Sequence, residues 1–173
     1  GAIFWNTGDE HDELGHISED PENRDRMMEK RMKKLDTAAE VIPLEEKVNF
    51  FGSKDADATI VSWGTPKGAI LDALELFAAE GLKVNFLQVR LILPFPTKYV
   101  TEVLSQAKCK IDIEMNYSGQ FASLVRQHTG IEMDHLVVKY NGRPISRDEV
   151  YESVKTIMTN SHSPRKVVLK HGA

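Results

Sequence analysis

From Val48 onward, apolar positions along the chain follow two spacings in turn, one typical of strands and one typical of helices. Short alternating or continuous apolar runs predict five strands, at residues 58–63, 84–93, 110–115, 135–140 and 166–170. Between them, apolar residues three and four positions apart predict helices at 66–80, 97–107, 118–129 and 146–158. This alternation is typical of βαβ units and predicts an α/β fold with a mainly parallel sheet. The pattern leaves the strand order and the direction of an edge strand open.

The first part of the chain, residues 1–47, has a different pattern and is predicted to be a linker arm ahead of an α/β domain at 48–173. An acidic loop at 8–16 is followed by Asp20 and Pro21, an N-cap residue and a proline at the first helical position. They predict a helix with one narrow apolar stripe among many charged residues, formed by Met28, Met32, Leu35 and Ala39. Such a helix buries only one side, which we expect to pack against a neighbour.

The most informative stretch is the turn from strand to helix at 114–120, with the sequence Glu-Met-Asn-Tyr-Ser-Gly-Gln. Ser118 is the predicted N-cap, and the first N–H groups of the helix would be free to bind a carboxylate or a phosphate. In open α/β sheets, ligands bind at such strand ends. Glu114 and Asn116 lie two positions apart and therefore face the same side. The alternative is a turn ordered by hydrogen bonds between these side chains and the backbone.

A second glycine turn, at 62–68, follows the first predicted strand and offers Thr65 as an N-cap. It could cradle an anion with help from Lys67, but it lacks the glycine spacings of dinucleotide and P-loop sites, so simple helix capping is favoured. Arg143 lies in an Asn-Gly turn at the entry to the last helix. It could meet a phosphate or an acidic partner, and a solvated turn is the alternative.

Composition narrows the function classes. The chain has 173 residues, of which 41% are apolar and 28% charged, as expected of one globular domain plus an arm. A net charge of −4 gives no basic excess for nucleic acid, and no apolar run of about 20 residues predicts a membrane span. The single Cys109 rules out an intrachain disulfide and a cluster held by four cysteines, and it favours a reducing, cytoplasmic setting. A start without methionine suggests a segment of a longer protein.

Residues that could carry chemistry are scattered. His11 and His16 lie five positions apart in a loop, which matches no compact metal template. The other histidines and Cys109 form no nucleophile constellation with a defined acidic partner, and the carboxylates suggest no acid/base pair. The residues alone therefore predict no catalytic, cofactor-binding or metal-binding position.

Four motifs, in this order, resemble the C-terminal part of the alpha subunit of 2-oxoacid:ferredoxin oxidoreductases. They are Ser-Trp-Gly-Thr-Pro-Lys-Gly at 62–68, Leu-Pro-Phe-Pro at 93–96, the turn at 114–120, and Gly-Arg-Pro-Ile at 142–145. The arm, from residues 8–12 through 30–31, resembles the segment that joins this part to the preceding domain in the 2-oxoglutarate or broad 2-oxoacid branch. The resemblance covers nearly the whole chain.

The resemblance implies a three-layer αβα domain like the transketolase C-terminal domain, which mainly shapes the assembly. It implies that the whole enzyme decarboxylates a 2-oxoacid oxidatively, with coenzyme A as acyl acceptor and ferredoxin as electron acceptor. In that family, thiamine diphosphate with magnesium and the iron–sulfur cluster belong largely to the beta subunit. The substrate-side residues lie in the N-terminal domain of the alpha subunit. This chain alone is therefore expected to be inactive, and the choice of 2-oxoacid cannot be inferred from it.

Candidate contacts follow from the motifs and remain hypotheses. We expect the polar turn to contact the beta subunit or the N-terminal domain of the same subunit, through Glu114, Asn116, Ser118, Gly119 and Gln120. Thr65 and Arg143 are further candidates for a contact with a subunit or an anion. The alternative is a small-ligand module in which the helix starts near Thr65 and Ser118 bind a phosphate of coenzyme A or another nucleotide. A third possibility is homodimerisation of the transketolase type.

Overall fold

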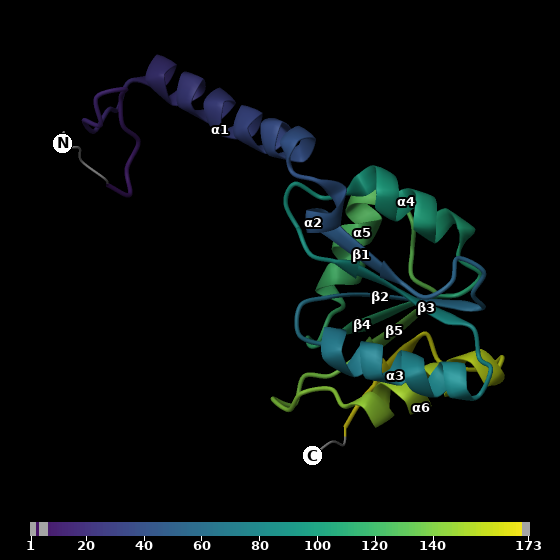
Figure 1. The fold of residues 1–173 in the computed structure, drawn as a ribbon. Coiled ribbons are helices and arrows are strands. Elements are labelled where there is room, and N and C mark those ends of the chain that lie inside the picture. Colours follow the sequence, from purple (N-terminus) through teal and green to yellow (C-terminus); the bar gives the residue numbers. More distant parts are fainter. Residues whose placement is uncertain (1–2, 4–6, 171–173) are drawn as a thin grey trace. The chain divides into compact units, whose positions relative to one another are not determined.

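The computed structural model describes residue 3 and residues 7–170. The chain divides into two compact units between Ile42 and Pro43, a little before the predicted domain boundary, and each unit is described by itself (Figure 1).

The first unit contains the long helix α1, Pro21–Val41. It begins as predicted, because the Asp20 carboxylate accepts hydrogen bonds from the N–H groups of Glu22 and Asn23 and Pro21 occupies the first helical position. Met28 and Met32, in the predicted apolar stripe, are exposed. Within its own unit, therefore, this part of the stripe is not covered.

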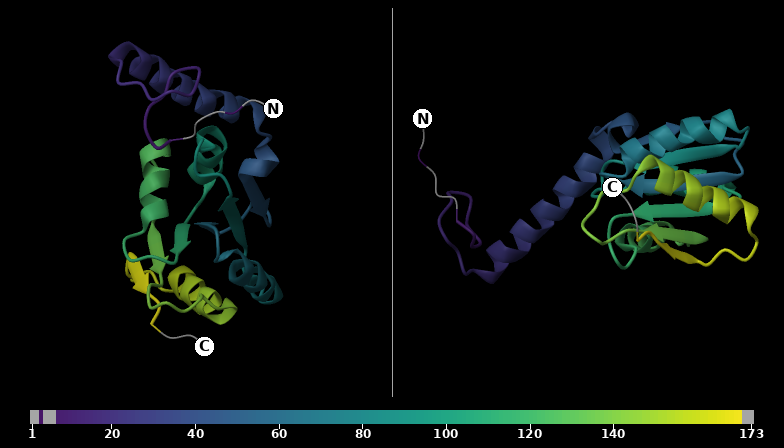
Figure 2. Two further views of the ribbon diagram at one scale, coloured as in Figure 1. Left: turned by 90° about the vertical axis from the view of Figure 1, so that its left-hand side faces the viewer. Right: turned by 90° about the horizontal axis from the view of Figure 1, so that it is seen from below.

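The loop before α1 folds back beside that helix (Figure 2). The Glu10 carboxylate accepts hydrogen bonds from Arg24 at 3.2 Å and from Arg31 at 2.5 Å. Asn23 is buried, and its side-chain amide donates to the carbonyl of His11. The hydrogen bond from Arg31 lowers the pKa of Glu10. The acidic loop is thus held to α1 by an ion-pair cluster.

The second unit is built on a six-stranded sheet with strand order β1-β3-β2-β4-β5-β6 (Figure 1). The strands are β1 Val48–Phe51, β2 Ala58–Trp63, β3 Val84–Val89, β4 Lys110–Glu114, β5 His135–Val138 and β6 Lys166–Val168. All neighbours are parallel except β1 and β3, which are antiparallel. The predicted mainly parallel α/β sheet is confirmed, but the predicted count of five strands is wrong. β1 was missed because it has only four residues at the sheet edge, too few for a periodic signal.

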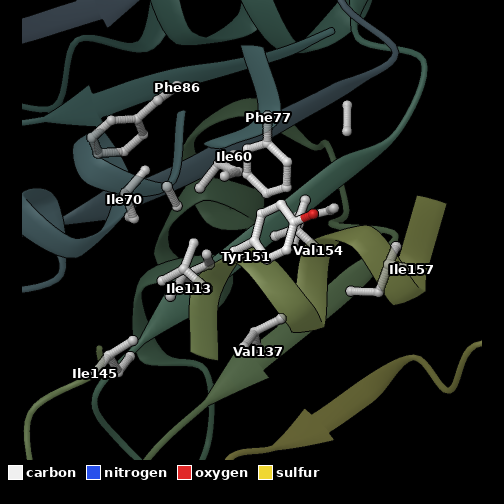
Figure 3. Packing of buried hydrophobic residues seen from close by; sticks show 14 residues of the cluster. Ile60, Ile70, Phe77, Phe86, Ile113, Val137, Ile145, Tyr151, Val154 and Ile157 are labelled. Atoms are coloured by element: carbon white, nitrogen blue, oxygen red, sulfur yellow. The ribbon is translucent and has the colours of Figure 1, made fainter. Parts of the chain in front are cut away.

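Helices cover both faces of this sheet, as two further views show (Figure 2). The helices are α2 Leu44–Lys47, α3 Lys67–Ala79, α4 Thr97–Gln106, α5 Gln120–Thr129 and α6 Arg147–Thr159. One apolar cluster joins α3 and α6 to one face, with Phe77, Phe86 and Tyr151 among its members (Figure 3). A second cluster joins α4 and α5 to the other face. The expected three layers are present.

The crossings of the chain create a crevice at the centre of the sheet. From β2 the chain crosses to β3 on one side, and from β4 it crosses to β5 on the other, although β2 and β4 are neighbours. The loops that follow these two strands therefore diverge. In open α/β sheets this is the position at which ligands bind.

Candidate functional site

The turns at 62–68 and 114–120, far apart in the sequence, meet at this crevice. A cavity of about 220 Å³ lies between them. Of the predicted site residues, it brings together Thr65, Asn116 and Gln120. The lining residues are Trp63, Gly64, Thr65, Pro66, Met115, Asn116 and Gln120.

The start of α5 is bound by side chains of the strand that leads into it. Glu114 is only 1% exposed, and its carboxylate accepts hydrogen bonds from the N–H groups of Phe121 at 2.8 Å and Ala122 at 2.9 Å. The Asn116 side chain donates to the same carboxylate at 2.5 Å, and its oxygen accepts from the N–H groups of Gly119 and Gln120. The positive end of this helix thus holds a carboxylate of the chain itself.

The predicted N-cap at Ser118 is wrong. Gly119 occupies that position with a left-handed φ of 73°, so the N-cap residue itself has no side chain to cap the helix, and Ser118 is exposed. A Cβ atom at Gly119 would lie 3.3 Å from Cδ1 of Leu136 in addition to the backbone strain, so glycine is required. The helix starts two residues later than predicted because Glu114 and Asn116 replace the local serine cap.

A second acid lies on the same face of β4. Asp112 is fully buried, and neither of its carboxylate oxygens has a hydrogen-bond partner. Burial raises the pKa of Asp112 well above its usual value, and the nearby Glu114 carboxylate raises it further. Burial thus favours the protonated form of Asp112 more than it does for an exposed aspartate.

The loop between β5 and α6 is fixed by a buried cation. The Lys139 ammonium is fully buried and donates to both carboxylate oxygens of Glu149, at 2.8 and 2.9 Å, and to the carbonyl of Pro144. Ser146 and Glu149 form the predicted capping box. Burial alone would raise the pKa of Glu149, but hydrogen bonds from Lys139 and Ser146 hold it below its usual value. Arg143 lies exposed in this loop.

The start of α3, unlike the starts of α5 and α6, has no side-chain hydrogen bond that caps it. Its N-cap is Pro66 and makes no side-chain hydrogen bond, so the predicted cap at Thr65 is wrong. Thr65 is exposed, and the Lys67 ammonium lies 6.0 Å from the centre of the Phe51 ring. The side of the crevice formed by α3 is thus the side without an internal carboxylate.

Large apolar side chains are exposed to solvent at the carboxyl ends of the parallel strands. We call Trp63, Met115, Tyr117 and Tyr140 the aromatic rim; they are 42%, 38%, 67% and 47% exposed. The Tyr117 and Tyr140 rings meet edge to face, 4.9 Å apart. Sequence reasoning did not select these residues as site candidates, although Trp63, Met115 and Tyr140 end predicted strands and Tyr117 lies two residues beyond one.

Groups that bind metals do not gather in the described part of the chain, where no three or more His, Cys, Asp or Glu side chains converge. Cys109 is half-buried, and burial raises the pKa of its thiol, so it is not an activated thiolate. None of the helices in residues 7–170 has the length and apolar content needed to cross a bilayer.

Comparisons with known proteins agree with this architecture. Residues 56–150 match the family described as "Pyruvate:ferredoxin oxidoreductase core domain II". The 2-oxoacid:ferredoxin oxidoreductase subunit alpha of Saccharolobus solfataricus is 47% identical over 167 residues, which are 96% of this chain and 26% of that protein. The 2-oxoacid:ferredoxin oxidoreductase 2, subunit alpha, of Aeropyrum pernix is 44% identical over the same shares of the two chains.

A solved structure extends the similarity to the fold. It is described as 2-oxoglutarate:ferredoxin oxidoreductase from Magnetococcus marinus with 2-oxoglutarate, coenzyme A and succinyl-CoA bound. It matches 91% of this chain and 27% of its own chain, with a TM-score of 0.75 and 27% identity. The chain thus spans about a quarter of the length of these relatives. It belongs to the pyruvate:ferredoxin oxidoreductase core domain II family and is a domain of the kind that the alpha subunits of 2-oxoacid:ferredoxin oxidoreductases contain.

Proposed function

We propose that this chain is a non-catalytic domain that contributes to the assembly of a 2-oxoacid:ferredoxin oxidoreductase. One observation carries the proposal: at the crevice where α/β enzymes bind ligands, the first N–H groups of α5 are already bound by Glu114 and Asn116. These side chains order the loop and leave the helix end no free donor for a substrate. This arrangement therefore supports a role of the crevice as a binding surface for another part of the enzyme, and not as a reaction centre.

The whole enzyme, in this proposal, carries out the coenzyme A-dependent oxidative decarboxylation of a 2-oxoacid and passes electrons to ferredoxin. Its thiamine diphosphate, magnesium and iron–sulfur cluster lie outside this chain. The donor set supports this, because one half-buried cysteine cannot supply the four thiolates of an ordinary cluster. The Magnetococcus marinus enzyme, with 2-oxoglutarate and coenzyme A bound, supports the reaction class.

The proposed partners are the beta subunit and the N-terminal domain of the same alpha subunit, in the cytoplasm. Residues 1–47 serve as the linker arm to that domain, and residues 48–173 form the assembly domain. Among the candidate contacts, Glu114 and Gly119 are buried and act by ordering the loop. The candidates left to touch a partner directly are Thr65, Asn116, Ser118, Gln120 and Arg143.

The test is activity and assembly, measured separately. We expect no 2-oxoacid-dependent reduction of ferredoxin or of a viologen dye by this chain alone, and normal reduction by the complete enzyme as the control. Deleting the domain from the complete alpha subunit should abolish the complex with the beta subunit. Reduction by the isolated chain, or intact assembly without it, would contradict the proposal.

A second candidate function is binding of a coenzyme A phosphate in the crevice. The observation in its favour is that α3 has no side-chain cap and borders the cavity, with Thr65 and Pro66 in its lining. Titration calorimetry of the complete alpha subunit with coenzyme A separates the two functions. Saturable heat that Thr65→Val and Lys67→Ala weaken would favour the ligand site, whereas the assembly function predicts heat that these variants leave unchanged.

A further inference from the structure

The aromatic rim consists of two pairs of exposed side chains at the carboxyl ends of β2, β4 and β5. Trp63 and Met115 line the crevice, and Tyr117 and Tyr140 touch each other beside it. Exposed apolar side chains that occur singly are normal on a protein surface, but several gathered at one end of a sheet are typical of an interaction site. Trp, Tyr and Met are also the residue types enriched in protein interfaces.

Cations surround the tyrosine half of this rim. The Lys166 ammonium lies 4.4 Å from the centre of the Tyr117 ring and donates to the Tyr117 carbonyl. Lys170 is joined to the same edge, because the side chain of Asn141 donates to its carbonyl. Arg143 extends from the neighbouring loop into water.

Carboxylates that could neutralise these cations are missing from the two loops concerned. Residues 115–119 and 139–146 contain no Asp or Glu. In the described part of the chain, Arg143, Lys166 and Lys170 form no ion pair. The rim thus presents apolar area next to the charges of Arg143 and Lys166, whereas Lys170 shares a cavity with acidic side chains of α6.

The crevice beside the rim suits a side chain better than a cofactor. Its volume of about 220 Å³ is below the ~300–1,000 Å³ typical of small-molecule sites. The N–H groups of α5 that could hold a phosphate there are bound by Glu114 and Asn116. An inserted apolar side chain would meet the exposed apolar side chains of Trp63 and Met115.

We propose that the aromatic rim docks an acidic surface of a partner subunit. This inference rests on the proposed assembly function and adds the chemistry of the partner. The partner inserts one apolar side chain into the crevice and places carboxylates against Arg143 and Lys166. A separate subunit fits better than a tethered domain, because charge complementarity chiefly speeds and directs encounters by diffusion, whereas a covalent link already supplies a high local concentration.

The test compares two rim variants of the complete alpha subunit, Tyr117→Ala and Arg143→Glu, in binding to the purified partner subunit. Both side chains are exposed, so thermal melting should be unchanged and serves as the check on folding. We expect each variant to weaken binding about tenfold or more at ~50 mM salt. For the Arg143→Glu variant, affinity should also fall less between ~50 and ~500 mM salt than it does for the unmodified subunit, because the variant lacks part of the attraction that salt screens.

The matched control is Lys54→Glu, which reverses the charge of an exposed lysine in the loop before β2. This loop lies at the amino end of β2, whereas the rim lies at the carboxyl ends of the parallel strands. The control variant should bind like the unmodified subunit. If deleting the domain abolishes assembly while both rim variants bind normally, the docking surface is refuted and the assembly function stands. If assembly survives deletion, the assembly function itself fails. Coenzyme A binding that needs Tyr117 and no partner subunit would overturn the inference in favour of a ligand site.

Discussion

Replacing Glu114 by glutamine removes the charge at the start of α5 and keeps the shape of the side chain. In the native chain the carboxylate accepts from two backbone N–H groups, at 2.8 and 2.9 Å, and from the Asn116 amide. A carboxylate has acceptors for all three donors, but a glutamine has one acceptor oxygen and an NH₂ group. In the Glu114→Gln variant, the new NH₂ group must therefore face a backbone or amide N–H group at a buried position, and two donors then lie against each other.

The expected cost follows from these bonds. Hydrogen bonds to a charged acceptor contribute about 1.5–3 kcal/mol each, and a buried N–H left without a partner costs about 1–3 kcal/mol. One lost and one weakened bond give a loss of about 2–4 kcal/mol in the free energy of unfolding. For a chain of this size, that lowers the melting temperature by roughly 5–15 °C.

The assay is urea and thermal unfolding of the chain followed by circular dichroism, with amide hydrogen exchange at Phe121 and Ala122 as the local measurement. Ser118→Ala is the matched control, because Ser118 is the cap that the sequence predicts but stands exposed in the structure. It should change the free energy of unfolding by less than about 0.5 kcal/mol. A Glu114→Gln variant as stable as the native chain, or a Ser118→Ala variant that loses about 1 kcal/mol, would refute the reasoning.

Three further predictions concern other buried or paired groups. Asp112 has a raised pKa in the folded chain, so its own contribution to stability is fully present below the unfolded pKa of about 3.9 and is lost as pH rises toward the folded pKa. The Asp112→Asn variant lacks this contribution, so its stability relative to the native chain should rise by up to about 1.4 kcal/mol per pH unit above pH ~4 in urea unfolding; parallel stability profiles of the two chains would contradict the raised pKa. Lys139→Met should cost about 3–5 kcal/mol, and adding Glu149→Gln should recover part of it, measured as a double-mutant cycle; additive losses would argue against the buried pair. Glu10→Gln should speed amide exchange at residues 10–18 without changing exchange in the sheet, and unchanged exchange in that loop would show that its contacts with Arg24 and Arg31 do not hold it.

Regular periodicity predicted most of the fold. The strand and helix positions from β2 onward follow from apolar spacing, and the α6 capping box and the α1 start follow from local residue types. Both signals are local, so a single sequence shows them. The edge strand β1 was not predicted, because its four residues form a strand only by pairing with β3, which is distant in the sequence.

The alternation at 110–115 shows the limit of this approach. Alternating polar and apolar residues are typical of a strand with one face in water. Here the polar positions Asp112 and Glu114 are buried on the side of the sheet covered by α5, Asp112 with a raised pKa and Glu114 as a helix cap. Sequence reasoning found the right turn and the right pair, Glu114 and Asn116. It could not find their partners, because side-chain capping from a strand depends on where the next helix is packed.

The carboxylate that closes the start of α5 also keeps this helix end from binding free anions of the cell. A group tethered to the same strand competes with free ligands at an effective concentration of about millimolar or more, and Glu114 pays little additional ordering cost when it binds. Inorganic phosphate and nucleotides would have to displace it and leave a buried charge unpaired. The domain thus keeps the geometry of a ligand-binding fold while the start of α5 is closed to free anions, and the uncapped start of α3 is the side of the crevice that stays open to them.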